Sequence, residues 1–279
     1  KSLFYSQDME NVHQGIELFE SLSYSKSAFL RILSGFGEIN LSSVSDITDI
    51  KKLMFGGYSK HEAQKEMCLY VSLWVLASLA KFELWTNIKT LNLRNNNLSQ
   101  LPESFGNLTQ LRSFTWDYEK VELPKSISNL KNITSLDLSS NKLSQLPESF
   151  GNLTQLTELN LCYNKLSILP ESFGNLKNLK ILNLSSNHLS QLPESFGNVT
   201  QLTELDLSSN NLSQLPESFG NLTQLTSLSL SSNNLSQLPE SFVNLTQLTE
   251  LNLRKNNFLE KEKRRIMSLL PKKCRCYFR

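Results

Sequence analysis

A motif of the form Leu-x-x-Leu-x-Leu-x-x-Asn-x-Leu recurs through residues 88–258, and most copies follow one another at a spacing of 23 residues. Eight copies are present, counting one degenerate unit in which Glu119 replaces the asparagine. Repetition at a fixed period is the signature of a solenoid, in which each unit buries its apolar face only by stacking on its neighbours. The asparagine column consists of Asn96, Asn141, Asn164, Asn187, Asn210, Asn233 and Asn256.

The leucines of the motif alternate as they do in a short strand with one buried face. In the unit that covers residues 157–162, Leu159 and Leu161 are predicted to point into the core. Glu158, Asn160 and Cys162 are then predicted to point to the opposite face of the sheet. The sequence therefore predicts a parallel sheet with one buried face and one face open to a ligand.

The rest of each unit must return the chain to the start of the next strand. Asn164 is expected to be buried, where its amide would satisfy backbone groups that neighbouring turns leave unpaired. Pro170 is expected to fix a turn, followed by a loose helical or 3₁₀ segment over residues 171–176 whose Phe173 fills the space between layers. Gly174 is expected to let the backbone bend beside Phe173.

The segment Leu101-Pro102-Glu103-Ser104-Phe105-Gly106-Asn107-Leu108, followed by Leu111-x-x-Phe114, resembles the leucine-rich repeat family. The resemblance covers about 170 residues, and its Leu-Pro-x-x-Phe-Gly-Asn-Leu form resembles intracellular bacterial proteins and the plant Ras-group-related class. It implies an α/β fold, a right-handed horseshoe with a parallel sheet on its concave side. It also implies ligand binding rather than chemistry.

Both flanks of the repeats are predicted to cap the open ends of the stack. Residues 1–87 carry no repeat and read as four helices that form a small α-helical N-terminal domain. The uncharged run over residues 67–80 is too short for a membrane span, which needs about 20 residues. Residues 88–258 form the repeats, and residues 259–279 are similar to a C-terminal cap made of a charged helix and a short strand.

The C-terminal end is strongly basic. From Arg254 onward the chain has ten Lys or Arg and two Glu, a net charge of +8, whereas the remaining residues sum to −6. The cations at Lys261, Lys263, Arg264 and Arg265 would suit phosphates or an acidic membrane surface. The favoured interpretation is the solvated face of a capping helix. The sequence contains neither the clustered aromatic residues nor the recognition helix that a nucleic-acid-binding module would usually have.

Residues suited to catalysis or metal binding do not gather in the sequence. His13, His61 and His188 have no metal-binding spacing, and the Cys274-x-Cys276 pair has no second ligand pair. Cys162 has no histidine in register with it that would activate a nucleophile. The sequence therefore predicts a non-enzymatic protein with no cofactor and no metal site.

The candidate binding residues are the large or charged side chains on the concave face, because such side chains dominate interface energies. They concentrate in the N-terminal half of the sheet, with tyrosines as the expected anchors. The irregular second repeat, in which Trp116 occupies a core leucine position, is expected to bulge the sheet or to adjust it to the N-terminal cap. The candidates are Arg94, Asp117, Tyr118, Asp137, Glu158, Asn160 and Tyr163.

These features predict a protein-interaction scaffold that binds a protein partner through the concave face, with no nucleic acid and no membrane span. Two alternatives stay open. Residues 1–87 could be the active domain of a bacterial effector or adaptor whose repeats select a host target, or the chain could be an adhesive surface component. Because Cys68 lies in an apolar helix and Cys162 stands alone, a reducing cytoplasm is favoured over a secreted or host-delivered location. The oligomeric state is left open.

Overall fold

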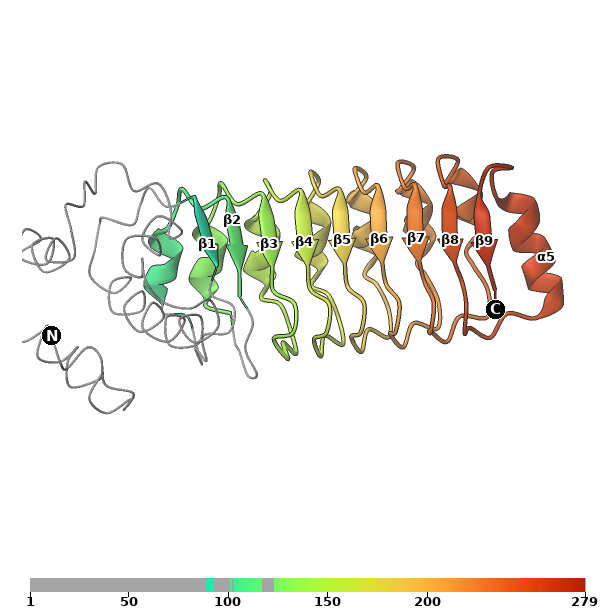
Figure 1. Cartoon of the computed structure of the whole chain (residues 1–279), viewed down its shortest axis with the longest axis horizontal. Helices are drawn as coiled ribbons and strands as arrows, with labels where there is room; N and C mark the ends of the chain where they lie inside the picture. Colours follow the sequence, from blue (N-terminus) through green and yellow to red (C-terminus); the bar gives the residue numbers. More distant parts are fainter. Residues whose placement is uncertain (1–88, 93–100, 102, 117–122, 279) are drawn as a thin grey trace, which may run out of the picture.

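The computed structural model of the chain describes residues 89–92, 101, 103–116 and 123–278. These residues form a solenoid whose nine strands lie side by side in one parallel sheet, in the order β1 to β9 along the chain (Figure 1). The predicted α/β solenoid is therefore confirmed. The helices expected over residues 1–87 lie outside the described residues.

Each of the first seven repeats contributes one three-residue strand and one five-residue 3₁₀ helix on the opposite side of the stack, and the eighth contributes a strand that is followed by an α-helix (Figure 1). The strands are β1 (Thr90–Asn92), β2 (Ser113–Thr115), β3 (Ser135–Asp137), β4 (Glu158–Asn160), β5 (Ile181–Asn183), β6 (Glu204–Asp206), β7 (Ser227–Ser229), β8 (Glu250–Asn252) and β9 (Arg275–Tyr277). The 3₁₀ helices are η4 (Glu103–Asn107), η5 (Lys125–Asn129), η6 (Glu148–Asn152), η7 (Glu171–Asn175), η8 (Glu194–Asn198), η9 (Glu217–Asn221) and η10 (Glu240–Asn244). One α-helix, α5 (Glu260–Leu269), closes the C-terminal end.

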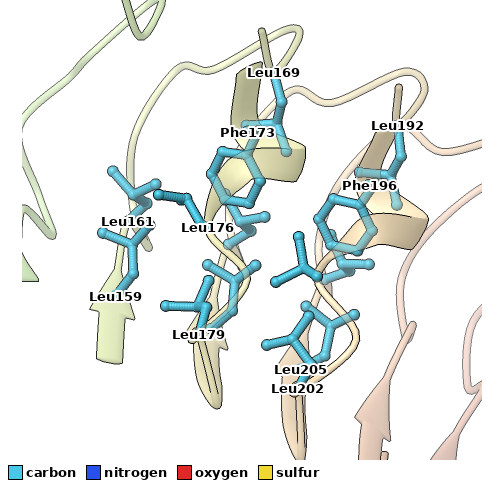
Figure 2. Packing of buried hydrophobic residues seen from close by; sticks show 14 of the residues in the cluster. Leu159, Leu161, Leu169, Phe173, Leu176, Leu179, Leu192, Phe196, Leu202 and Leu205 are labelled. Carbon is cyan, nitrogen blue, oxygen red and sulfur yellow. The ribbon is translucent and has the colours of Figure 1, made fainter. Parts of the chain in front are cut away.

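The core is a continuous layer of leucines and phenylalanines between the sheet and the 3₁₀ helices. Leu159 and Leu161 point inward from the strand side, and Phe173 and Phe196 point inward from the helix side (Figure 2). The rings of Phe173 and Phe196 stack with centroids 5.9 Å apart. Since burying one such side chain contributes about 1.5–3 kcal/mol, the stack holds successive repeats together.

The second repeat differs from the others by an exchange of core volume. Ile127 occupies the place of the usual phenylalanine, while Phe114 and Trp116 replace two strand leucines, and all three are fully buried. Phe114 contacts Phe105 of the first repeat with ring centroids 4.7 Å apart. The expected bulge is absent from the described part of this repeat, because β2 pairs with β1 and β3 residue for residue. Larger residues on the strand side thus compensate for the smaller one on the helix side.

The asparagine column ties each repeat to the ones before it. The Nδ2 of Asn187 donates to the carbonyl oxygen of Leu161 in the preceding repeat, at 2.9 Å, and to that of Leu184 in its own, at 3.0 Å. Its Oδ1 accepts from the backbone N–H of Leu166 at 3.0 Å. Each such amide satisfies backbone groups of two repeats, which explains why a polar residue is stable in the core. Buried members of the described column are Asn141, Asn164, Asn187, Asn210 and Asn233, and Asn256 at the last repeat is half-buried.

On the helix side, a glutamate of one repeat caps the 3₁₀ helix of the next. An Oε2 of Glu217 accepts from the backbone N–H of Ser241 at 3.2 Å, and the Ser241 hydroxyl donates to the Glu217 carbonyl at 2.6 Å. A carboxylate at the start of a helix also interacts favourably with the positive end of the helix dipole. The helix side therefore has its own set of contacts between repeats.

In five of the described 3₁₀ helices this close approach requires a glycine, whereas the sequence suggested that Gly174 allows a bend; Ser128 stands at this position in η5. A Cβ atom at Gly174 would lie 2.3 Å from the carbonyl oxygen of Ser195 in the next repeat. In η10, which is the last 3₁₀ helix, Val243 occupies the glycine position and is 48% exposed, because no further 3₁₀ helix packs on η10. The change from glycine to valine marks the end of the array.

Helix α5 covers the last repeat, and β9 extends the sheet beyond it. Ile266 is the buried residue of α5. The Nε and Nη2 atoms of Arg265 donate to Glu262 at 2.9 and 2.8 Å, and Nη2 also donates to the carbonyl oxygen of Leu238. An oxygen of Glu262 accepts from the backbone N–H of Leu238 at 3.1 Å. The pair therefore satisfies backbone groups of the last repeat.

Candidate binding surface

The face of the sheet that points away from the core, here called the sheet face, carries three columns of side chains. The register places equivalent residues of neighbouring strands directly beside one another, as for Glu158 and Ile181. The first column opens each strand: Ser135, Glu158, Ile181, Glu204, Ser227, Glu250 and Arg275. The second closes each strand: Asp137, Asn160, Asn183, Asp206, Ser229 and Asn252. The third lies two residues further: Ser139, Cys162, Ser185, Ser208, Ser231 and Arg254.

The acidic and amide side chains of the second column fold back onto the chain. The Oδ1 of Asp137 accepts from the backbone N–H of Ser139 at 3.0 Å, and that of Asn160 accepts from the N–H of Cys162 at 3.2 Å. Such bonds to the backbone two residues on are typical of Asp and Asn at turns. Asp137 and Asn160, both sequence candidates, are half-buried and help to end their strands.

The third column is buried in the middle of the sheet and becomes exposed toward its C-terminal end. Ser139, Cys162 and Ser185 are buried, whereas Arg254 is exposed. Cys162, expected to face outward, is only 9% exposed. Within the three columns, the exposed side chains of β4 and β5 are therefore those of the first column, Glu158 and Ile181.

In that first column an apolar residue lies between two acids. Ile181 on β5 is 40% exposed, and its neighbours Glu158 on β4 and Glu204 on β6 are both exposed. An oxygen of Glu158 lies 3.3 Å from the hydroxyl of Ser135 on β3 and accepts its hydrogen bond. Strands β4 to β6 thus present an isoleucine flanked by carboxylates.

Tyr163 projects from the turn that follows β4 and is 65% exposed. Its φ of 55° lies in the left-handed region, and Ser140, Ser186, Ser209, Ser232 and Lys255 share this conformation in other repeats. The backbone N–H of Tyr163 donates to the carbonyl oxygen of Ser185 at 3.0 Å. A bulky residue in this conformation is uncommon, and here the neighbouring repeat holds its backbone in place.

Two exposed apolar residues that follow Tyr163 in the sequence, Ile168 and Ile181, are not among the candidates predicted from the sequence. Ile168, 55% exposed, stands where other repeats have Gln145, Gln191 or Gln214, and Ile181 stands between two glutamates of its column. Reading every column for a polar-to-apolar exchange would have found both. Three exposed apolar side chains thus lie within residues 163–181 of the sequence, two of them, Tyr163 and Ile181, on the sheet side of the solenoid.

The remaining candidates, Arg94, Asp117 and Tyr118, lie outside the described residues, as does Asn96 of the asparagine column. His13 and His61 also lie outside them, and His188 is exposed. Among the described residues, no group of three or more His, Cys, Asp or Glu side chains is placed to hold a metal ion.

The two cysteines around β9 are half-buried thiols. Burial, and then the neighbouring Cys274, raise the pKa of Cys276 to about 12. Burial, and then Glu250, also raise the pKa of Cys274 above its usual value. Both groups are therefore protonated and weakly nucleophilic at neutral pH. None of the described helices has the length and apolar character needed to cross a bilayer.

Comparison with known families identifies the repeats. The leucine-rich repeat model matches residues 123–166, 166–212 and 214–258, and a second leucine-rich repeat model matches residues 87–108. No curated protein matches the chain.

Three solved structures are similar to this chain. A plant peptide hormone receptor, RGFR1, in complex with RGF2 is 30% identical over 69% of this chain and 32% of its own, with a TM-score of 0.58. Toll, in the Toll–Spatzle complex of Drosophila, is 28% identical over 69% of this chain and 26% of its own, also with a TM-score of 0.58. A leucine-rich repeat protein of Leptospira interrogans is 27% identical over 70% of this chain and 73% of its own, with a TM-score of 0.33.

The match to two of these structures thus covers about a third or less of their length. The repeat models together cover more than half of this chain, and the buried leucines and asparagines of the structure follow the same period. The chain belongs to the leucine-rich repeat family.

Proposed function

We propose that the chain is a non-enzymatic interaction scaffold that binds a protein partner on its concave sheet face. The observation that carries the proposal is a pair of exposed apolar side chains on neighbouring repeats, Tyr163 on the turn after β4 and Ile181 on β5. Most other outward polar side chains of these repeats hydrogen-bond within the fold. Tyr163 and Ile181 stand at positions where other repeats carry serine, so the fold does not need their apolar side chains. Exposed aromatic and apolar residues with a polar rim are typical of interface centres.

The contact zone is proposed to centre on β4 and β5. Tyr163 and Ile181 would supply the buried area, and Glu158 would form the charged rim beside them. Asp137 and Asn160 would contact the partner at the edge of this zone. Arg94, Asp117 and Tyr118 extend the proposed surface toward the N-terminal end on the strength of the sequence alone.

The similar receptors support a proteinaceous partner. Their structures show RGFR1 with RGF2 and Toll with Spatzle. The free thiols at Cys162, Cys274 and Cys276 support a reducing compartment such as the cytoplasm as the place of binding. Helices over residues 1–87 are proposed to cap the first repeat.

The test replaces the exposed apolar residues by the serine that other repeats carry at the same positions. Tyr163→Ser copies Ser186 and Ser209, and Ile181→Ser copies Ser227. The matched control is Val243→Gly, which removes an exposed apolar side chain from the opposite side of the solenoid. Partners are captured from source cells on each purified protein and quantified by mass spectrometry.

A protein that the wild type and the control capture equally, and that the double variant loses at least tenfold, would support the proposal. The double variant must keep the circular dichroism spectrum and thermal midpoint of the wild type. Equal capture of every partner by the double variant would reject β4 and β5 as the contact zone.

A further inference from the structure

The C-terminal end of the solenoid carries an excess of positive charge that the fold does not use. Between residues 254 and 278 there are nine Lys or Arg and two Glu. Lys263 pairs with Glu260 at 2.6 Å, and Arg265 pairs with Glu262 at 2.8 Å. These contacts neutralise both acids of the segment.

Four exposed cations lie on α5 and on the turn that follows it: Lys261, Arg264, Lys272 and Lys273. We call these four residues the basic end. None of them forms an ion pair with any described residue, and the Nε of Arg264 makes only a long hydrogen bond, 3.4 Å, to the carbonyl of Glu260. Figure 1 shows α5 at the far end of the row of strands, where no further repeat covers it.

Exposed apolar side chains accompany these cations. Met267 is 53% exposed and lies three residues after Arg264, on the same side of α5. Leu259, at the start of α5, is 77% exposed. Neither residue serves the core, which α5 contacts through Ile266.

We propose that the basic end docks on an anionic lipid surface, with the outer side of α5 lying against the headgroups. Clustered Lys and Arg on a helix attract acidic lipids, and exposed Met and Leu side chains insert at the boundary between headgroups and acyl chains. A single-stranded nucleic acid would instead favour exposed aromatic rings for stacking, and duplex DNA is distinguished by the test below. Tyr277 and Phe278 are half-buried, with Arg254 over the ring of Tyr277 and Lys263 over that of Phe278.

The neighbouring repeats determine how the solenoid would stand on such a surface. Residues 181–253 contain six Asp or Glu and no Lys or Arg. A negatively charged bilayer repels this part of the molecule while it attracts the basic end. The protein therefore binds end-on, and its sheet face stays accessible to a partner.

The test measures sedimentation of the full chain with phosphatidylcholine vesicles, with and without phosphatidylserine. One variant carries Lys261→Gln, Arg264→Gln, Lys272→Gln and Lys273→Gln. A matched control removes the same charge from exposed lysines of the repeats, by Lys125→Gln, Lys131→Gln, Lys165→Gln and Lys177→Gln. A third variant, Met267→Ser, tests the apolar contact, and circular dichroism establishes that all variants are folded.

We expect the wild type and the control to bind only the vesicles with phosphatidylserine, less so at high salt, and the first variant to bind about a hundredfold more weakly. Met267→Ser is expected to weaken binding several-fold at every salt concentration. Absence of wild-type binding, or equal losses in the first variant and the control, would overturn the proposal. Tighter binding to duplex DNA than to the vesicles at equal phosphate concentration would also overturn it.

Discussion

Arg265 of α5 reaches across to Glu240 of the last repeat, with its Nη1 3.3 Å from the glutamate Oε1. In the preceding repeat the equivalent glutamate, Glu217, accepts instead from the backbone N–H of Ser241 in the next 3₁₀ helix. The guanidinium of Arg265 thus takes the place of the backbone N–H that a further 3₁₀ helix would offer to Glu240. The C-terminal cap therefore satisfies the last glutamate of the column with a side-chain donor.

This relationship predicts that Arg265 stabilises the whole array. Arg265→Ala removes the guanidinium that donates to the carboxylate of Glu262 and to the carbonyl of Leu238, so the free energy of unfolding should fall by about 1–3 kcal/mol. Urea denaturation monitored by circular dichroism measures the loss. Arg264→Ala, on the exposed side of the same helix, is the control and should change stability by less than about 0.5 kcal/mol. Equal effects of the two substitutions would contradict this role.

The same pair predicts an acid-sensitive contribution to stability. The hydrogen bond from Arg265 lowers the pKa of Glu262 below its usual value of 4.5. A lowered carboxyl pKa contributes stability that is fully present above the unfolded-state pKa and is lost as the pH falls through the folded-state pKa. The stability difference between wild type and Glu262→Gln should therefore be constant above pH 4.5 and shrink below it. Urea midpoints over an acidic pH series would show this, and a constant difference down to the acid limit would refute it.

The asparagine column predicts a difference between the interior and the end of the array. Asn187→Ala would leave the backbone N–H of Leu166 without its acceptor and would remove one of the two amide donors from each of the carbonyls of Leu161 and Leu184, which costs about 1–3 kcal/mol. Asn256→Ala should cost less, because Asn256 is half-buried and water can reach its partners. Denaturation midpoints of the two variants provide the comparison. A larger loss for Asn256→Ala would show that the C-terminal cap, rather than the column, limits stability.

The glycine column predicts that one added methyl group separates two repeats. Gly197→Ala would place a Cβ 2.3 Å from the carbonyl oxygen of Ser218, so the repeats must move apart at a cost of about 1–3 kcal/mol. Val243→Gly, at the equivalent position of the last repeat, should leave the thermal midpoint nearly unchanged. Limited proteolysis should reveal new cleavage near residue 197 only in the first variant. An unaffected Gly197→Ala protein would mean that the 3₁₀ helices slide apart without loss.

The fold could be predicted from sequence because its determinants recur at the same interval. Leu159 and Asn187 each have counterparts at the same position of other repeats. The period of the sequence therefore predicts that both side chains are buried. The reason for the glycines could not be predicted, since the contact of Gly174 with Ser195 depends on how closely two units approach in space. Similarly, the sequence does not show that one carboxylate oxygen of Asp137 accepts a hydrogen bond from the backbone N–H of Ser139.

The candidate surface was harder to predict than the fold. Tyr163 was identified from its size, and the structure shows it exposed on the turn after β4. Ile181 was missed because it looks like an ordinary apolar residue until its strand register places it between Glu158 and Glu204. Residues that differ from the repeat consensus are the candidates for binding in such a protein. The sequence does not identify them until the strand register shows which residues lie next to them in the sheet.

The phenylalanine stack has a consequence for how such a chain can change over generations. The rings of Phe196 and Phe219, and those of Phe219 and Phe242, lie at the same centroid distance of 6.3 Å and within 6° of parallel. The packing surface between one pair of repeats therefore matches the packing surface between the next pair. Duplication or loss of one whole unit leaves every remaining surface with a matching neighbour, so the protein can lengthen or shorten in fixed steps while both its ends stay as they are.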